Sequence, residues 1–124
     1  MNLVDSSGWL EYAAEGPNAA LFAAPIEDTA NLLVPTICVL EVFKRLKSQR
    51  GEATALQVLS AMQLGRVVDL DFDLALAASD LGLRHKLPLA DSVILATARA
   101  HDATLWTQDA DFKGLPGVRF IRHR

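Results

Sequence analysis

Short apolar runs alternate with longer amphipathic segments along the chain. Runs that are apolar throughout are typical of strands in a parallel sheet, because both faces of such a strand are covered. The longer segments begin and end at helix signals such as a cap residue, proline or glycine. The predicted strands are residues 3–4, 31–34, 66–69, 104–107 and 118–121. The predicted helices are residues 6–14, an alanine-rich segment after a break at 16–18, and residues 35–49, 52–64, 72–85 and 90–101.

Particular residues mark several of these helix boundaries. Ser6 or Ser7 is expected to cap the first helix, because a hydroxyl can accept from the free N–H groups of a first turn. Pro35 suits the start of the third helix, and Gly51 suits its end. The helix over 90–101 is apolar on almost all sides, so we expect it to be deeply buried.

The order of these elements predicts an α/β fold. Strands that alternate with helices form a parallel sheet covered on both faces, and the crossovers are right-handed. We therefore expect a three-layer α/β/α architecture with a short, parallel, five-stranded sheet. Repeats and linkers are absent from the sequence, so residues 1–124 are expected to form a single domain. In such sheets, ligands bind beyond the carboxyl ends of the strands, where the strand order reverses.

Composition narrows the functional classes. No apolar run approaches the roughly 18 residues of a membrane span, and no basic segment followed by an apolar one marks a secretory signal. The one cysteine, Cys38, has no partner within the chain for a disulfide. We therefore expect a cytoplasmic protein that has no membrane partner.

Charge is distributed unevenly, although the net charge is only −3. Residues 1–43 contain no lysine or arginine. One basic group falls in the third helix (Lys44, Arg45, Lys47 and Arg50), and a second falls at the C-terminal end (Lys113, Arg119, Arg122 and Arg124). Such patches are compatible with phosphate binding, and a solvated surface explains each of them equally well.

Carboxylates follow two of the predicted strands. Asp5 comes directly after the first strand, and Asp109 and Asp111 follow the fourth. If these strands are neighbours, their acids converge at one edge of the sheet. Ordinary structural roles are also open, because Asp is a common helix cap and a common turn residue.

Two further acids lie on predicted helices. Asp91 opens the helix over 90–101, where it can serve as the N-cap, and its carboxylate lies along an apolar seam. A buried carboxylate needs a partner or a cation. Glu41 falls on the same side of its helix as Arg45, so a surface ion pair is the alternative to a site role.

Clustered carboxylates without a His–Cys ligand set favour hard divalent cations. Like charges repel and raise one another's pKa unless a cation lies between them. Mg²⁺ takes oxygen ligands, and such an ion activates water and neutralises charge on a phosphodiester. The pattern therefore points to metal-assisted hydrolysis of phosphodiesters.

The chain resembles the PIN-domain ribonucleases, in particular the VapC-type toxins of toxin–antitoxin pairs. The similar segments are residues 3–9, 35–42, 87–98, 105–112 and 116–118, of which 87–98 is the most specific. The resemblance implies that Asp5, Glu41, Asp91 and Asp109 are catalytic. It implies Mg²⁺ or Mn²⁺ held mainly by Asp5 and Asp91, with Asp109 and Glu41 completing or supporting the site.

The resemblance also implies auxiliary residues and partners. Ser6 or Ser7 and Thr107 correspond to small hydroxyl residues beside the acids, and Asp111 to a further acid. Lys44, Arg45 and Lys47 are candidates for holding the RNA backbone. The implied partners are an RNA substrate, a second copy of the chain, and a cognate antitoxin in a hetero-oligomer. Trp9 and Phe22 could face such a partner or pack in the core.

Two alternatives of other classes remain. A non-catalytic domain of the same fold would bind RNA or a protein partner without turnover. A phosphorylated receiver-like signalling domain has similar length and also carries acids at strand ends. It would need paired acids after the first strand, and only Asp5 follows that strand here.

Overall fold

The structure is a computed structural model that describes all 124 residues, and its centre is a five-stranded parallel sheet. The strands are β1 (Asn2–Val4), β2 (Leu32–Pro35), β3 (Arg66–Val68), β4 (Thr104–Thr107) and β5 (Val118–Phe120). The helices are α1 (Ser6–Ala13), α2 (Ala19–Glu27), α3 (Thr36–Arg50), α4 (Glu52–Met62), α5 (Phe72–His85) and α6 (Leu89–Ala100), with short 3-10 helices η1 (Thr29–Asn31) and η2 (Ala110–Phe112). The predicted α/β fold with a parallel sheet is confirmed.

The strand order is β3-β2-β1-β4-β5, which places β1 at the centre. Leu3 of β1 pairs with Leu33 of β2 on one side and with Leu105 of β4 on the other. The order reverses between β1 and β4, so the edge beyond these two strands is the expected ligand position. A receiver-type sheet has the order 2-1-3-4-5. The observed order therefore excludes the receiver-like alternative.

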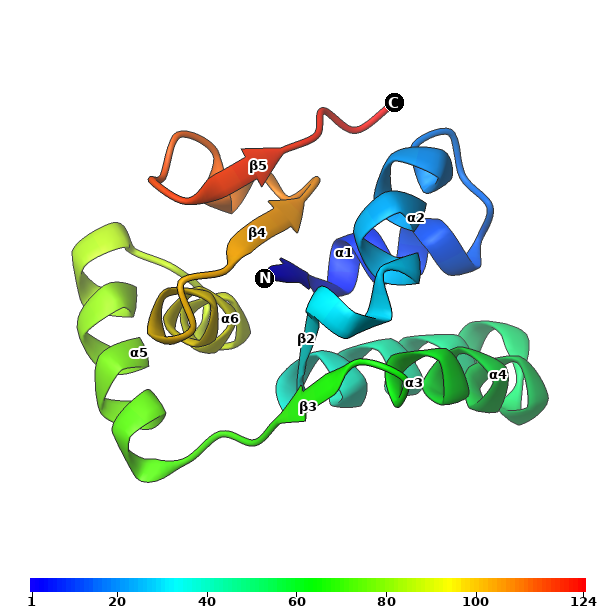
Figure 1. Ribbon diagram of the computed structural model, residues 1–124, viewed down its shortest axis with the longest axis horizontal. Coiled ribbons are helices and arrows are strands. Elements are labelled where there is room, and N and C mark those ends of the chain that lie inside the picture. The colour runs from blue at the N-terminus through cyan, green and yellow to red at the C-terminus, as the bar shows by residue number, and fades with distance from the viewer.

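Helices cover the sheet on both sides (Figure 1). α1 and α2 lie on one side of β1 and β4, and α5 and α6 lie on the other, while α3 and α4 form a helical hairpin beside β2 and β3. This arrangement is the predicted three-layer architecture. None of the helices has the length and apolar character that a membrane span requires.

The core consists of the strands and the helix faces that pack on them. Leu3, Leu33 and Leu105 are fully buried, and α6 is buried without interruption over residues 92–98, as its apolar character predicted. Trp9 and Phe22 are also fully buried, so they pack in the core and do not face a partner.

Several element boundaries differ from the sequence prediction, each for a local reason. Asp5, not Ser6 or Ser7, caps α1, because its carboxylate accepts from the Gly8 N–H at 3.0 Å. α6 begins at Leu89 after Pro88, so Asp91 lies within the first turn and is not the N-cap. The second strand begins one residue later than predicted, because residue 31 ends the unpredicted helix η1.

Candidate active site

Three carboxylates converge beyond the carboxyl ends of the central strands. Asp91 comes from the first turn of α6, Asp109 caps η2 in the loop after β4, and Asp111 lies within η2. One oxygen from each lies within 4.8 Å of the others. We call Asp91, Asp109 and Asp111 the three-acid cluster. The adjacency of β1 and β4 brings Asp5 to the same edge.

Asp5 is buried and held by three donors. Its Oδ1 accepts from the Ser7 hydroxyl at 2.7 Å and from the Gly8 N–H at 3.0 Å, and its Oδ2 accepts from the Thr107 hydroxyl at 2.6 Å. Burial raises the pKa of Asp5 to about 6, and these hydrogen bonds oppose the rise. Asp5 therefore joins β1, α1 and β4, and its charge acts on Asp91 of the three-acid cluster.

Asp91 occupies an unfavourable place for a negative charge. Burial raises its pKa to about 8, and the negative charges of Asp109, Asp5 and Asp111 act in the same direction. Every charge that contributes to this shift is negative. A group of this kind is stabilised by a cation placed between the carboxylates, because the repulsion then becomes attraction.

Oxygen ligands at this spacing fit a hard divalent ion. Mg²⁺ and Mn²⁺ prefer carboxylates and water, and Mg²⁺ usually keeps several waters beside one or two carboxylates. The three-acid cluster supplies that ligand chemistry, and Asp111 and Asp109 are at least partly exposed to solvent. The site thus fits the implied metal. The cluster contains Asp91 and Asp109 of the predicted metal set, and it contains Asp111 where the sequence prediction had Asp5.

Glu41 approaches the site from α3. Its Oε1 accepts a hydrogen bond of 2.6 Å from the Ser6 hydroxyl, which links α3 to the start of α1. Glu41 is partly buried, whereas Arg45 one turn later is exposed. The bond to Ser6 holds Glu41 at the start of α1, where Asp5 is the helix cap, and the catalytic role of Glu41 stays a prediction.

Cys38 shows that the acids share one environment. The thiol is fully buried, which raises its pKa, and the negative charges of Asp5, Glu41 and Asp91 raise it further. The cysteine therefore stays protonated and is neither a nucleophile nor a metal ligand. Glu41 itself lies outside the three-acid cluster.

A hydroxyl network orders the loop after β4. The Thr107 hydroxyl, which donates to Asp5, accepts from the Asp109 N–H at 2.9 Å. The Ser7 hydroxyl accepts from the Gln108 N–H at 3.2 Å. The resemblance singled out Thr107 and Ser6 or Ser7 as hydroxyl residues beside the acids, without assigning them hydrogen bonds. It did not single out Gln108, because a backbone donor carries no residue-specific signal in the sequence.

Removing the Thr107 hydroxyl tests this network. In Thr107→Val, the shape of the side chain is kept, but the Asp5 carboxylate and the Asp109 N–H each lose a partner inside the protein. A hydrogen bond to a charged group contributes roughly 1.5–3 kcal/mol, so we expect the free energy of unfolding to fall by about 2 kcal/mol. Urea denaturation measures this loss. Thr107→Ser keeps the hydroxyl and serves as the control; equal stability of the valine variant and the unmodified chain would contradict the role.

The basic residues of α3 lie outside this network. Lys44, Arg45 and Lys47 are exposed, and the Lys47 ammonium lies 5.8 Å from the centre of the Phe43 ring. The structure gives none of them a contact with the acids. Their assignment to the RNA backbone stays a prediction.

Comparisons with known proteins point to one family. The model of the PIN domain matches residues 3–118. A search of curated proteins by sequence gave no match.

Solved structures resemble the whole chain. A toxin–antitoxin complex from Klebsiella pneumoniae contains a chain with 26% identity and a TM-score of 0.82, covering 96% of both chains. VapC20 of Mycobacterium tuberculosis, a sarcin–ricin loop cleaving toxin, has 17% identity and a TM-score of 0.79 over 100% of this chain and 99% of its own. FitAcB from Neisseria gonorrhoeae has 21% identity and a TM-score of 0.70 over 90% and 89% of the two chains. The last two likenesses concern the fold.

Proposed function

The chain belongs to the PIN domain family, and from that premise we propose that it is a divalent-metal-dependent endoribonuclease that hydrolyses RNA phosphodiesters. The observation that carries the proposal is the three-acid cluster, in which carboxylate oxygens converge within 4.8 Å. The cluster lies at the edge where α/β sheets bind ligands. Burial and the neighbouring carboxylates raise the pKa of Asp91 to about 8 there, so the ionised form that would bind a cation is disfavoured in the protein alone.

Asp91, Asp109 and Asp111 would hold Mg²⁺ or Mn²⁺. An ion at this position would orient and activate water and would offset the charge that builds on the phosphodiester. Asp5 would support the site from behind, since its hydrogen bonds fix Thr107 and through it the backbone of Asp109. Glu41, held by Ser6, would supply further negative charge beside the cluster and orient groups that approach it.

We also propose that the protein is the toxin of a toxin–antitoxin pair. The support is the likeness to the chain from the Klebsiella pneumoniae toxin–antitoxin complex, which extends over almost all of both chains. On this proposal, the chain forms a homodimer and is silenced by an antitoxin in a hetero-oligomer, both within the cytoplasm. Co-expression with the product of a neighbouring gene, followed by size-exclusion chromatography, tests the pairing.

Cleavage of total cellular RNA tests the nuclease directly. We expect the chain, purified without other proteins, to produce discrete fragments with Mg²⁺ or Mn²⁺. Excess EDTA should stop the reaction, and added Mg²⁺ should restore it. EDTA-resistant cleavage would contradict metal dependence. RNA that is bound but stays intact with either ion would favour the non-catalytic binding domain.

A further inference from the structure

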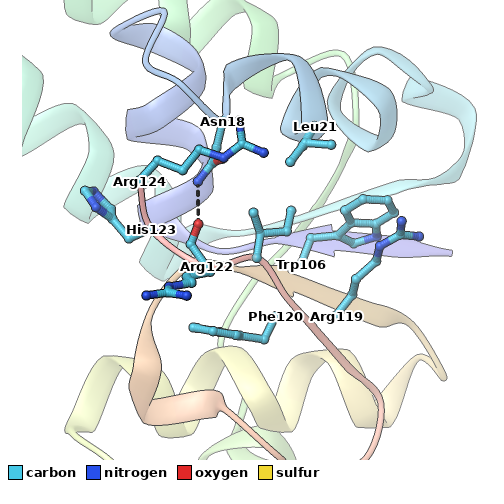
Figure 2. Close-up of a pocket in the computed structure, with 9 residues that line it drawn as sticks. Asn18, Leu21, Trp106, Arg119, Phe120, Arg122, His123 and Arg124 are labelled. Carbon is cyan, nitrogen blue, oxygen red and sulfur yellow. Dashed lines mark hydrogen bonds between the residues drawn. The ribbon is translucent and has the colours of Figure 1, made fainter.

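Residues 112–124 contain no aspartate or glutamate, and the end of this C-terminal segment forms one wall of a pocket separate from the three-acid cluster (Figure 2). The pocket has a volume of about 700 Å³, within the range of small-molecule sites, and its lining includes Trp106, Arg119, Phe120, Arg122 and Arg124. No aspartate or glutamate lines it. We call this cavity the C-terminal basic pocket.

An arginine and an aromatic ring are stacked inside the pocket. Arg119 and Trp106 are cross-strand partners in the β4–β5 pairing. The Arg119 guanidinium carbon lies 4.3 Å from the centre of the Trp106 ring, and Figure 2 shows both beside Leu21 of α2. Trp106 is held in turn, because its indole N–H donates to the Asn2 side chain at 2.9 Å. This stack forms a flat, positively charged platform before any ligand binds.

One residue that lines the pocket is hydrogen-bonded to the loop that carries Asp109 and Asp111. The side-chain amide of Asn18, which is fully buried, donates to the Arg122 carbonyl at 2.9 Å and to the Gln108 side chain at 3.0 Å. Gln108 directly precedes Asp109. Asn18 therefore fixes the C-terminal tail, which lines the pocket, beside the loop that carries Asp109 and Asp111.

A second cavity of similar size provides a contrast. It measures about 720 Å³ and lies beside β3, at the opposite edge of the sheet. Its charged lining includes Asp69, Asp71 and Asp73 together with Arg66. A polyanion would be repelled by that set of charges. Cavity volume alone does not distinguish the two places, but charge does.

We propose that the C-terminal basic pocket binds unpaired nucleotides of the single-stranded RNA that the protein cleaves, outside the scissile position. This inference rests on the proposed function and assigns part of its substrate binding. The Arg119–Trp106 platform stacks a base, which every nucleobase permits, and Arg122 and Arg124 bind the phosphates that lead toward Asp109. Arginine suits both roles, because its guanidinium is planar and binds phosphate through paired donors.

Binding of fluorescein-labelled oligouridine in EDTA tests the pocket without cleavage. We expect Arg119→Gln/Arg122→Gln to bind roughly tenfold more weakly than the unmodified chain. The slope of the logarithm of the binding constant against the logarithm of the salt concentration should be shallower by about 0.7 for each phosphate that is no longer neutralised. Arg66→Gln/Arg84→Gln removes the same charge from exposed positions on β3 and α5 and should bind as the unmodified chain does. Arg119→Lys/Arg122→Lys should keep the salt dependence and lose affinity, since lysine retains the charge without the planar stack.

The outcomes separate this inference from the nuclease proposal. In cleavage assays, the Arg119→Gln/Arg122→Gln variant should raise KM and leave kcat unchanged. If Arg119→Gln/Arg122→Gln and Arg66→Gln/Arg84→Gln bind RNA equally well, the assignment of the pocket to RNA binding is overturned, whether or not the chain cleaves RNA. Polyglutamate that displaces the label as well as unlabelled oligouridine does would assign the pocket to an acidic protein segment, which also overturns the inference. If the Arg119→Gln/Arg122→Gln variant binds RNA more weakly but the unmodified chain cleaves no RNA, the pocket's role in RNA binding is supported and the nuclease proposal is overturned.

Discussion

The Asp91→Asn variant is expected to lose more than about 100-fold in RNA cleavage while it keeps the fold, because substitutions around metal ligands already cost roughly 10–100-fold. Asp91 is the member of the three-acid cluster on which the charges of Asp109, Asp5 and Asp111 all act. An amide has nearly the same shape as a carboxylic acid, but it carries no charge to hold a divalent ion.

The variant should also be no less stable than the unmodified chain in metal-free buffer. Because the pKa of Asp91 is raised to about 8, its side chain is mainly neutral below that pH, so the neutral amide replaces it without adding repulsion. Circular dichroism and urea denaturation in EDTA check the fold, and isothermal titration with Mn²⁺ checks the loss of ion binding.

Asp80→Asn is the matched control, since Asp80 is an exposed acid of α5 outside the cluster. It should cleave RNA and bind Mn²⁺ as the unmodified chain does. A folded Asp91→Asn protein with full cleavage activity in Mg²⁺ would refute the role of Asp91. Full cleavage without Mn²⁺ binding would refute the link between the cluster and catalysis.

The stability of the metal-free protein should fall as the pH rises from about 4 to about 8. The ordinary pKa of Asp is 3.8, whereas the folded protein raises that of Asp5 to about 6 and that of Asp91 to about 8. Between these values, the folded state binds more protons than the unfolded state. Raising the pH removes protons that favour folding, so the free energy of unfolding decreases.

Asp5 and Asp91 affect the stability over different ranges of pH. For buried Asp5, the stabilisation is complete below pH 3.8 and is lost by about pH 6. That difference in pKa corresponds to a contribution to the free energy of unfolding on the order of 3 kcal/mol. Asp91 acts in the same direction, and its window extends to about pH 8.

Divalent ions should reduce the fall in the free energy of unfolding with rising pH. An ion that binds the ionised carboxylates of the folded state stabilises it by mass action, and its effect grows as the acids lose their protons. Urea denaturation between about pH 5 and 9, with EDTA or with Mg²⁺, measures both trends. Mg²⁺ should therefore stabilise the protein more at the higher pH.

Variants separate this effect from the titration of other groups. Asp91→Asn should show a shallower decline above about pH 6 in EDTA, whereas Asp80→Asn should follow the unmodified chain. A free energy of unfolding that rises between about pH 5 and 8 in EDTA would mean that the acids are compensated within the protein. That result would contradict the cation site.

Much of the fold was readable from the sequence, because local signals and burial agree along the chain. The apolar runs and the amphipathic segments predicted the five strands and the main helices, and residues 92–98 are buried as the continuous apolar surface of α6 implied. Positions of the acids relative to the strands also predicted which edge of the sheet carries the site. Parallel strands end at one edge, so Asp5 and Asp109 had to lie there once β1 and β4 were neighbours.

Only the tertiary structure decided which oxygens meet. Two of the hydrogen bonds that position the acids join residues far apart in the sequence, since Thr107 donates to Asp5 and Ser6 donates to Glu41. Spacing along a helix placed Glu41 beside Arg45, and the packing of α3 against α1 gave it Ser6 instead. Asp5 is engaged in three hydrogen bonds, one of them from Thr107 of β4, and Asp111 of η2 takes its place in the three-acid cluster. The direction of a side chain depends on its neighbours in space, and for these residues the neighbours come from other elements of the fold.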